Sequence, residues 1–154
     1  MRVLAIDPGP LQTGFAIMSG LSVERFGIVE NTLLMSRALP GYGRYPDLMA
    51  YEMVSCYGMP VGAEVFDTCV WIGRFLEQFE TETKPVFRRD VKHHLCNSAK
   101  AKDGNIRQAI IDKYPPTGGG KTPQIGTKAQ PGPLFGVSTH VWPAIGVGLT
   151  AQGL

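Results

Sequence analysis

The sequence contains few cysteines, no long apolar run and no internal repeat. Its 154 residues include three cysteines, an odd number at wide spacing, which argues against a disulfide framework and suits a reducing compartment. No segment approaches the roughly 20 apolar residues that cross a bilayer. The N-terminus also lacks a basic segment followed by an apolar one, so we expect no signal peptide and no membrane association.

The remaining composition is typical of one soluble globular domain spanning residues 1–154, with 44% hydrophobic and 18% charged residues. The net charge of +2 conceals an asymmetry. Residues 1–83 carry five Arg and ten acids, a balance of −5, whereas residues 84–154 carry ten Lys or Arg and three acids, a balance of +7. An acidic half with candidate metal ligands, joined to a basic half, suits an enzyme that holds a polyanion over a metal site.

An aspartate stands at the end of the first predicted strand. The apolar run Val3–Ile6 predicts a buried strand, which stops at Asp7 and is followed by Pro8, Gly9 and Pro10. Apolar segments at Thr13–Met18 and Ser22–Val29 predict two further antiparallel strands, with the acid at the tip of the first hairpin. A carboxylate at the mouth of a central strand needs a partner. The sequence leaves open whether that partner is a set of turn amides or a bound cation.

Glu52 is the second candidate metal ligand. It is the one acid in the otherwise apolar segment Leu48–Val54, which predicts a fourth strand. A βββαβ arrangement places this strand beside the first, so that Glu52 comes close to Asp7. Two carboxylates on adjacent strands form a divalent-cation site of the kind that two-metal phosphoryl transfer requires. The alternative is a buried glutamate paired with an arginine, for which Arg2 and Arg44 are the candidates.

Helices and one long loop complete the predicted α/β fold. The sequence predicts a fifth strand at Pro85–Arg88. Apolar periodicity predicts a helix at Val61–Phe79, whose inward face carries Val65, Cys69, Ile72, Leu76 and Phe79. Capping residues and periodicity predict three more helices: from Asp90 toward Cys96, at Gly104–Tyr114 capped by Asp103, and at His140–Gln152 capped by Thr139. Pro143 limits where the last helix begins, because proline fits only the first turn. Asn31–Pro46 is expected to be irregular. Thr117–Val137 is rich in glycine and proline and too long for a connector, so we expect it to be either functional or mobile.

The segment GGGKT at residues 118–122 suggests a nucleotide-binding P-loop, but the pattern fails. The motif requires a glycine at the position that Pro115 occupies. It also requires a helix after Thr122, which Pro123 prevents. We therefore expect no nucleotide cofactor.

Several motifs taken together are more specific than any one of them. IDPG at residues 6–9, TGFA at 13–16, a glutamate inside a central strand, a VK pair at 91–92 and DGNIRQAI at 103–110 follow one another along the chain. This order resembles that of the RuvC-like Holliday junction resolvases. The segments AKDGNIRQAIIDKY and PGPLFGVSTHVWPAIGVGLTA resemble phage-type members of that family, and the likeness covers nearly the whole chain.

The resemblance implies an RNase H-like fold, with a mixed five-stranded sheet, a βββαβ core and flanking helices. It also implies a homodimer that cuts branched DNA with Mg²⁺ or Mn²⁺, in the cytoplasm of a bacterium or a phage-infected cell. The family's first-strand aspartate maps onto Asp7, its strand-four glutamate onto Glu52 and its last-helix acid onto His140. A further acid of cellular members falls on Pro143, which cannot bind a metal. We expect Asp7, Glu52 and His140 to be catalytic and metal-binding, with Mn²⁺ better than Mg²⁺ because imidazole suits Mn²⁺ better.

The expected function is therefore that of a structure-selective DNA endonuclease, a crossover junction endodeoxyribonuclease. The helix at Val61–Phe79 is expected to form part of the dimer interface. The residues expected to contact DNA are basic and belong to the second half of the chain: Lys92, Lys100, Lys102, Arg107, Lys121 and Lys128.

Two alternatives stay open. His140 and Pro143 in place of acids suggest a branched-DNA-binding protein with weakened catalysis. The segment IDPGPLQTG also resembles the phosphate-binding hairpin of actin-like ATPases and sugar kinases, although those proteins need two such domains.

Overall fold

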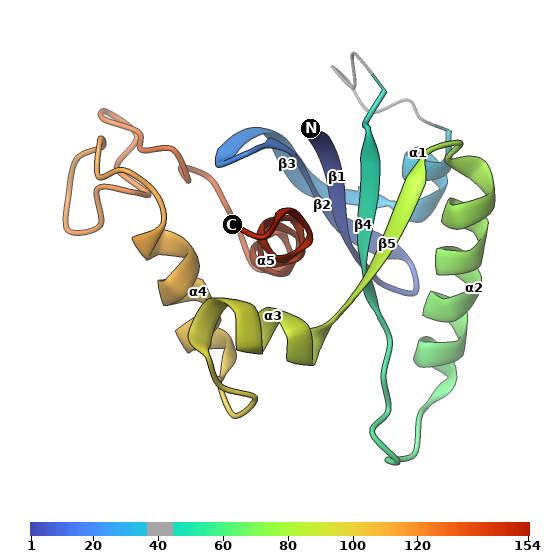
Figure 1. The fold of residues 1–154 in the computed structure, drawn as a ribbon. Helices are drawn as coiled ribbons and strands as arrows, with labels where there is room; N and C mark the ends of the chain where they lie inside the picture. The colour runs from blue at the N-terminus through green and yellow to red at the C-terminus, as the bar shows by residue number, and fades with distance from the viewer. Residues whose placement is uncertain (37–44) are drawn as a thin grey trace.

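A five-stranded sheet forms the centre of the computed structural model, which describes residues 1–36 and 45–154 (Figure 1). The strand order is β3-β2-β1-β4-β5. The strands are β1 (Arg2–Pro8), β2 (Gln12–Ser19), β3 (Ser22–Glu30), β4 (Leu48–Met53) and β5 (Glu82–Phe87). The pairs β1–β2 and β2–β3 are antiparallel, whereas β4 runs parallel to both β1 and β5. The predicted mixed sheet with a βββαβ order is confirmed.

Helices cover both faces of this sheet. They are α1 (Asn31–Met35), α2 (Ala63–Gln78), α3 (Arg88–Cys96), α4 (Asp103–Asp112) and α5 (Val141–Gln152). Helices α1 and α2 lie on one face, and α5 lies on the other with α3 and α4 beside it (Figure 1). Within residues 1–36 and 45–154, no helix has both the length and the apolar character that crossing a membrane demands.

The strand β1 is apolar without interruption because both of its faces are covered. Val3 and Ala5 belong to the core beneath α5, whereas Leu4 and Ile6 belong to the core beneath α2. Successive side chains of a strand point to opposite faces, so a strand buried on both sides shows no polar alternation. The same alternation determines the face on which the next residue, Asp7, lies.

Helix α5 is the central helix of the first core. Nine of its 12 residues are buried, which fits a helix packed between the sheet and two further helices. Pro143 lies in its first turn, as predicted. The helix begins one residue later than expected, with His140 rather than Thr139 at the N-cap. Within the described chain, the His140 side chain makes no capping hydrogen bond.

Two other helices begin at residues that the sequence did not indicate. Helix α3 begins at Arg88, which was predicted to end the fifth strand, and Asp90 is its third residue rather than its cap. Asp90 still accepts a hydrogen bond from the Phe87 amide, at 3.1 Å. Helix α4 begins at Asp103 itself, so the prediction that this residue is the cap was wrong. The Asp103 carboxylate instead pairs with Arg88.

Part of the segment predicted to be irregular is helical. The helix α1 is only five residues long, which is too short for an apolar period to reveal it. Its first residue, Asn31, is buried, accepts a hydrogen bond from the Thr13 hydroxyl at 2.6 Å and donates one to the Gly9 carbonyl at 2.9 Å. These bonds tie α1 to the turn that follows Asp7. Residues 37–44 of the expected irregular segment lie outside the described residues.

Helix α2 matches the predicted range closely, but its inward face differs by one residue. Cys69, which was predicted to face the core, is exposed, whereas Thr68 is buried. The Thr68 hydroxyl donates a hydrogen bond to the Glu64 carbonyl at 2.8 Å, so this polar side chain is satisfied within the helix. Cys69 therefore lies on the solvent-exposed face of α2, together with the apolar side chains of Phe66 and Val70.

The segment Thr117–Val137 folds back on itself beyond α4 (Figure 1). The amides of Gly118 and Gly132 donate to the carbonyls of Pro123 and Ile125 at 2.8 and 2.9 Å. A Cβ at either glycine would overlap neighbouring backbone atoms. The segment is therefore held by main-chain hydrogen bonds and close glycine contacts, and the GGGKT sequence is part of it.

Candidate functional site

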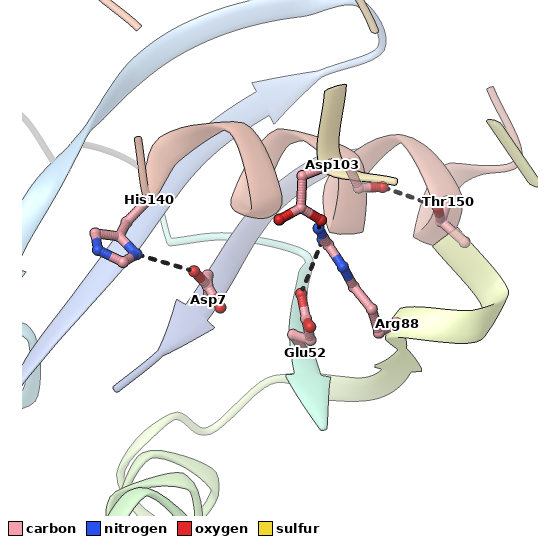
Figure 2. A network of polar contacts seen from close by, with 7 residues as sticks. Asp7, Glu52, Arg88, Asp103, His140 and Thr150 are labelled. Atoms are coloured by element: carbon pink, nitrogen blue, oxygen red, sulfur yellow. Dashed lines mark hydrogen bonds and ion pairs between the residues drawn. The ribbon is translucent and has the colours of Figure 1, made fainter. Parts of the chain in front are cut away.

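Asp7 and Glu52 end two neighbouring parallel strands on the same face of the sheet. The register pairs Ile6 of β1 with Tyr51 of β4, so the next residue of each strand is one of the two acids. Counting in steps of two from the residues beneath α5 places both carboxylates on the α5 face. Figure 2 shows the two side chains at these strand ends. The strand pairing expected from the sequence is present, and it brings the two acids together.

Both carboxyl groups are poorly solvated. The side chains of Asp7 and Glu52 are 21% and 20% exposed. Burial raises the pKa of Asp7 to about 6, against the opposing effect of Arg88. Burial also raises the pKa of Glu52 to about 7, with the charge of Asp7 adding to the rise and Arg88 opposing it. Each acid therefore keeps its proton to a higher pH than an exposed carboxyl group does.

One oxygen of Glu52 is buried and makes no hydrogen bond within the described residues. No hydrogen-bond donor in residues 1–36 and 45–154 reaches its Oε2 atom. The nearest cation is Arg88, whose Nη1 lies 3.7 Å from this oxygen, beyond hydrogen-bond distance. A buried carboxylate oxygen in this state favours the approach of a cation.

Arg88 joins Glu52 to Asp103. Its Nη2 atom contacts Oδ1 of Asp103, on the opposite side from Glu52 (Figure 2). The arginine alternative for Glu52 is thus observed, but with a different arginine from those considered. Arg2 donates to Glu24 at 2.8 Å, and Arg44 lies outside the described residues. Arg88 directly follows β5, the strand that neighbours β4, but this position alone does not identify its partners.

His140 approaches Asp7 from the start of α5. Its Nδ1 atom lies 3.8 Å from Oδ2 of Asp7, and its side chain is 69% exposed (Figure 2). This approach depends on Gly14 of β2, because a Cβ at that position would overlap the His140 carbonyl oxygen. The structure therefore places His140 at the rim beside Asp7, the acid that neighbours Glu52.

The donor atoms of this group suit a divalent cation. Carboxylate oxygens are the ligands that Mg²⁺ and Mn²⁺ prefer, and Mn²⁺ also accepts imidazole nitrogen. The uncompensated oxygen of Glu52 is consistent with a cation bound between the two acids. In the part of the chain that the structure describes, no three His, Cys, Asp or Glu side chains are grouped closely enough to hold a metal ion. The two acids thus supply oxygen ligands of the kind that such an ion prefers, and a third protein ligand requires a side chain to move.

Two hollow spaces meet at His140. The first, the β1–α2 hollow, measures about 930 Å³ and is lined by residues that include Asp7, Leu11, Ile28, Glu30, Trp71 and His140. The second, the α4–α5 cleft, measures about 660 Å³ and is lined by residues that include Arg88, Asp103, Arg107, Ser138, His140 and Trp142. His140 therefore has open space on two sides, and Asp7 lines the first of these two spaces.

The six predicted DNA contacts lie on helices and loops of the second half. Lys92 is half-buried on α3, Lys100 and Lys102 are exposed between α3 and α4, and Lys121 and Lys128 are exposed on the folded loop. Arg107 on α4 lies with its guanidinium carbon 4.9 Å from the centroid of the Trp142 ring. It is the predicted contact that lines the α4–α5 cleft.

Comparison with known proteins identifies the fold. No family model and no curated protein matches the chain. A structure of Thermus thermophilus RuvC is similar with a TM-score of 0.68 at 17% identity, covering 99% of this chain and 94% of that chain. T. thermophilus RuvC in complex with a Holliday junction substrate gives a TM-score of 0.69 at 16% identity, covering 99% and 93%. The predicted RNase H-like fold is confirmed, and it is the fold of RuvC.

Proposed function

We propose that this chain is a divalent-metal-dependent endonuclease that cuts branched DNA, with the four-way junction as its substrate. The observation that supports this best is the pair of buried acids, Asp7 and Glu52, at the ends of adjacent parallel strands. The similarity of the fold to that of RuvC bound to a Holliday junction substrate supports the choice of substrate.

Asp7 and Glu52 would hold Mg²⁺ or Mn²⁺, with His140 as the third ligand. When bound, such an ion lowers the pKa of water and offsets the negative charge of the phosphate under attack. The ends of β1 and β4 fix the two carboxyl groups, so little reorganisation is needed to present them. Both groups must lose their protons before they bind a cation. Their raised pKa values, about 6 and about 7, place this step near neutral pH.

The basic residues of the second half would hold the DNA backbone. Lys92, Lys100, Lys102, Arg107, Lys121 and Lys128 lie on α3, on α4 and on the loops around them, whereas the acid pair lies on the sheet. Contacts between basic side chains and phosphates release counterions, so binding weakens steeply as salt increases.

Helix α2 would form part of a homodimer interface. Phe66 and Val70 are 62% and 61% exposed, and the exposed residues Cys69 and Gly73 lie on the same face of the helix. A second copy of this chain would cover this stripe and present two sites to one junction. Phe66→Glu should then give monomers in sedimentation, whereas Phe135→Glu, at another exposed phenylalanine, should not.

A second candidate function is junction binding without cleavage. Arg88 already supplies a positive charge beside Glu52, and Pro143 cannot replace the further acid. A third ligand is not grouped with the two acids in the described residues. These observations favour a protein that keeps its DNA surface and has lost efficient cleavage.

Incubation of an end-labelled four-way junction with the purified protein separates the two functions. Magnesium, manganese and EDTA are compared, with a linear duplex of the same sequence as the substrate control and Asp7→Asn as the protein control. Metal-dependent cutting of the junction that Asp7→Asn abolishes would support the nuclease. Binding of the junction without cutting in either metal would support the second function. Equal binding of junction and duplex would contradict both.

A further inference from the structure

Two residues that line the α4–α5 cleft each lie next to one acid of the candidate site. Arg88 lines the cleft and lies 3.7 Å from Glu52, and His140 lines the cleft and lies 3.8 Å from Asp7. A ligand in the cleft that contacts both Arg88 and His140 would therefore be separated from each acid by one side chain. The cleft is the space next to the place where a phosphodiester would be cut.

Two guanidinium groups line this cleft, and each is held by a neighbour. Arg88 is held through Nη2 by the carboxylate of Asp103. Arg107 is held over the ring of Trp142, which is itself buried. An arginine fixed in this way loses less conformational entropy when it binds an anion. Both cations are thus prepared to receive an anion before one arrives.

Two further lining residues offer hydrogen-bond donors to a phosphate group. Ser138 and Thr139 line the cleft and offer hydroxyl donors. Asp103 also lines the cleft, and its charge opposes an anion, but its carboxylate is paired with Arg88. An arginine has five N–H donors, so Arg88 can bind Asp103 and a second anion at once.

We propose that the α4–α5 cleft binds one backbone phosphate of the cut DNA strand, a neighbour of the scissile phosphate, between Arg88 and Arg107. This inference rests on the proposed binding of branched DNA. It adds a second anchoring point on the strand and fixes which side of the acid pair that point occupies. The bond to be cut is then held between the two acids and the cleft.

A set of junctions with one neutral linkage each tests this inference. Methylphosphonate replaces a single phosphate at successive positions around the crossover, and binding is measured in EDTA, so that cleavage is not required. For the wild type, neutralising the phosphate that occupies the cleft should weaken binding roughly tenfold, the size expected for a charge-assisted interaction. In Arg107→Ala, the same substitution should weaken binding less than about twofold, because this variant no longer holds that phosphate.

Arg89→Ala is the matched control, since Arg89 is an exposed neighbour that does not line the cleft. In Arg89→Ala, neutralising the phosphate that occupies the cleft should weaken binding as much as it does in the wild type. We call a phosphate masked when its neutralisation weakens binding in the wild type but not in the variant. Arg88→Gln should mask the same phosphate as Arg107→Ala. Agreement between the two variants shows that the result does not come from misfolding of either one. The inference is overturned if Arg107→Ala masks no phosphate, or if Arg89→Ala masks the same one.

The outcomes for the cleft and for the nuclease are distinguishable. If one phosphate is masked but the protein never cuts the junction, the cleft proposal stands and the nuclease proposal is contradicted. Cutting without a masked phosphate would retain the nuclease and contradict the cleft. Absence of junction binding would contradict both.

Discussion

The two hollow spaces that meet at His140 differ in charge more than in size. The α4–α5 cleft contains Arg88 and Arg107 against a single acid, Asp103. The β1–α2 hollow contains the acids Asp7 and Glu30, and none of the described residues that line it is Lys or Arg. A phosphate is therefore attracted to the α4–α5 cleft and repelled from the β1–α2 hollow.

This difference gives the candidate site a direction. The wall of the β1–α2 hollow is largely apolar, with Leu11, Ile28 and Trp71 among its residues. A DNA strand that crosses the proposed site would place its charged backbone in the cleft, because the cleft carries the two arginines. The net charge of the whole chain, +2, would not have revealed this, because it averages the two sides.

The largest expected effect comes from the acid that lines the hollow and belongs to the candidate metal site. Asp7→Asn should reduce single-turnover cleavage of a four-way junction by at least roughly a thousandfold, because it removes a metal ligand. Binding of the junction should be preserved or tightened, since one repulsive charge is removed. Glu30→Gln, in the same hollow, should cut at a rate within about twofold of wild type, because Glu30 is not a proposed ligand. Cleavage by Asp7→Asn at a similar rate to wild type would remove the basis for the metal site.

His140 lies on the boundary between the two spaces, and its replacement should have the next largest effect. His140→Ala should lose roughly a hundredfold in cleavage rate with either metal, because a third ligand is removed. The wild type should cut faster with Mn²⁺ than with Mg²⁺, and His140→Asp should shift the preference toward Mg²⁺. Rates in both metals measure this. An unchanged preference in His140→Asp, together with an active His140→Ala, would assign His140 to DNA contact or to the start of α5.

Salt dependence tests the charge difference away from the acids. The double variant Lys92→Ala with Lys102→Ala should bind the junction less tightly, with a log–log salt slope smaller by about two, one for each phosphate that is no longer neutralised. Glu30→Gln should leave the slope unchanged. Fluorescence anisotropy between 50 and 200 mM salt, roughly the range over which such slopes are resolved, provides the measurement. An unchanged slope in the lysine variant would place the DNA surface elsewhere.

The smallest expected effect is on stability. The folded protein holds the Glu52 proton up to a pKa of about 7, compared with the ordinary value of 4.5. This group therefore stabilises the fold fully below pH 4.5, and the contribution is lost as the pH rises through about 7. Glu52→Gln, which has no charge to bury, should melt a few degrees above wild type at about pH 8 in EDTA and show no such gain at about pH 4.

Addition of Mn²⁺ at about pH 8 provides the opposite test. The wild type should gain stability because a ligand that binds only the folded state raises the melting temperature, whereas Glu52→Gln should gain little. Equal gains would show that the ion binds somewhere other than the acid pair.

The sheet and its two acids could be predicted because they follow from local patterns. Apolar runs mark β1 and β4, each run contains or ends in one acid, and a βββαβ order makes the strands neighbours. The strand period of two then places Asp7 and Glu52 on one face. No knowledge of distant packing is needed for these steps.

The role of Arg88 could not be predicted because it depends on three segments at once. Its partners, Glu52 and Asp103, lie in β4 and at the start of α4, and no sequence spacing relates them. The start of α5 was also misplaced by one residue, since threonine is in general a better capping residue than histidine. Here the N-cap residue, His140, lies against Gly14 of β2, a contact between segments that the sequence does not indicate.

The contact between Gly14 and the start of α5 has a consequence for the order in which the candidate site forms during synthesis of the chain. Both acids have been synthesised by residue 52, whereas His140 is added only after roughly 4 to 18 seconds of further elongation. Until then, the α5 face of the growing sheet has no central helix to cover it. A nascent chain that has not reached residue 140 therefore carries both carboxylates without His140, and the proposed nuclease site would be complete only when α5 docks.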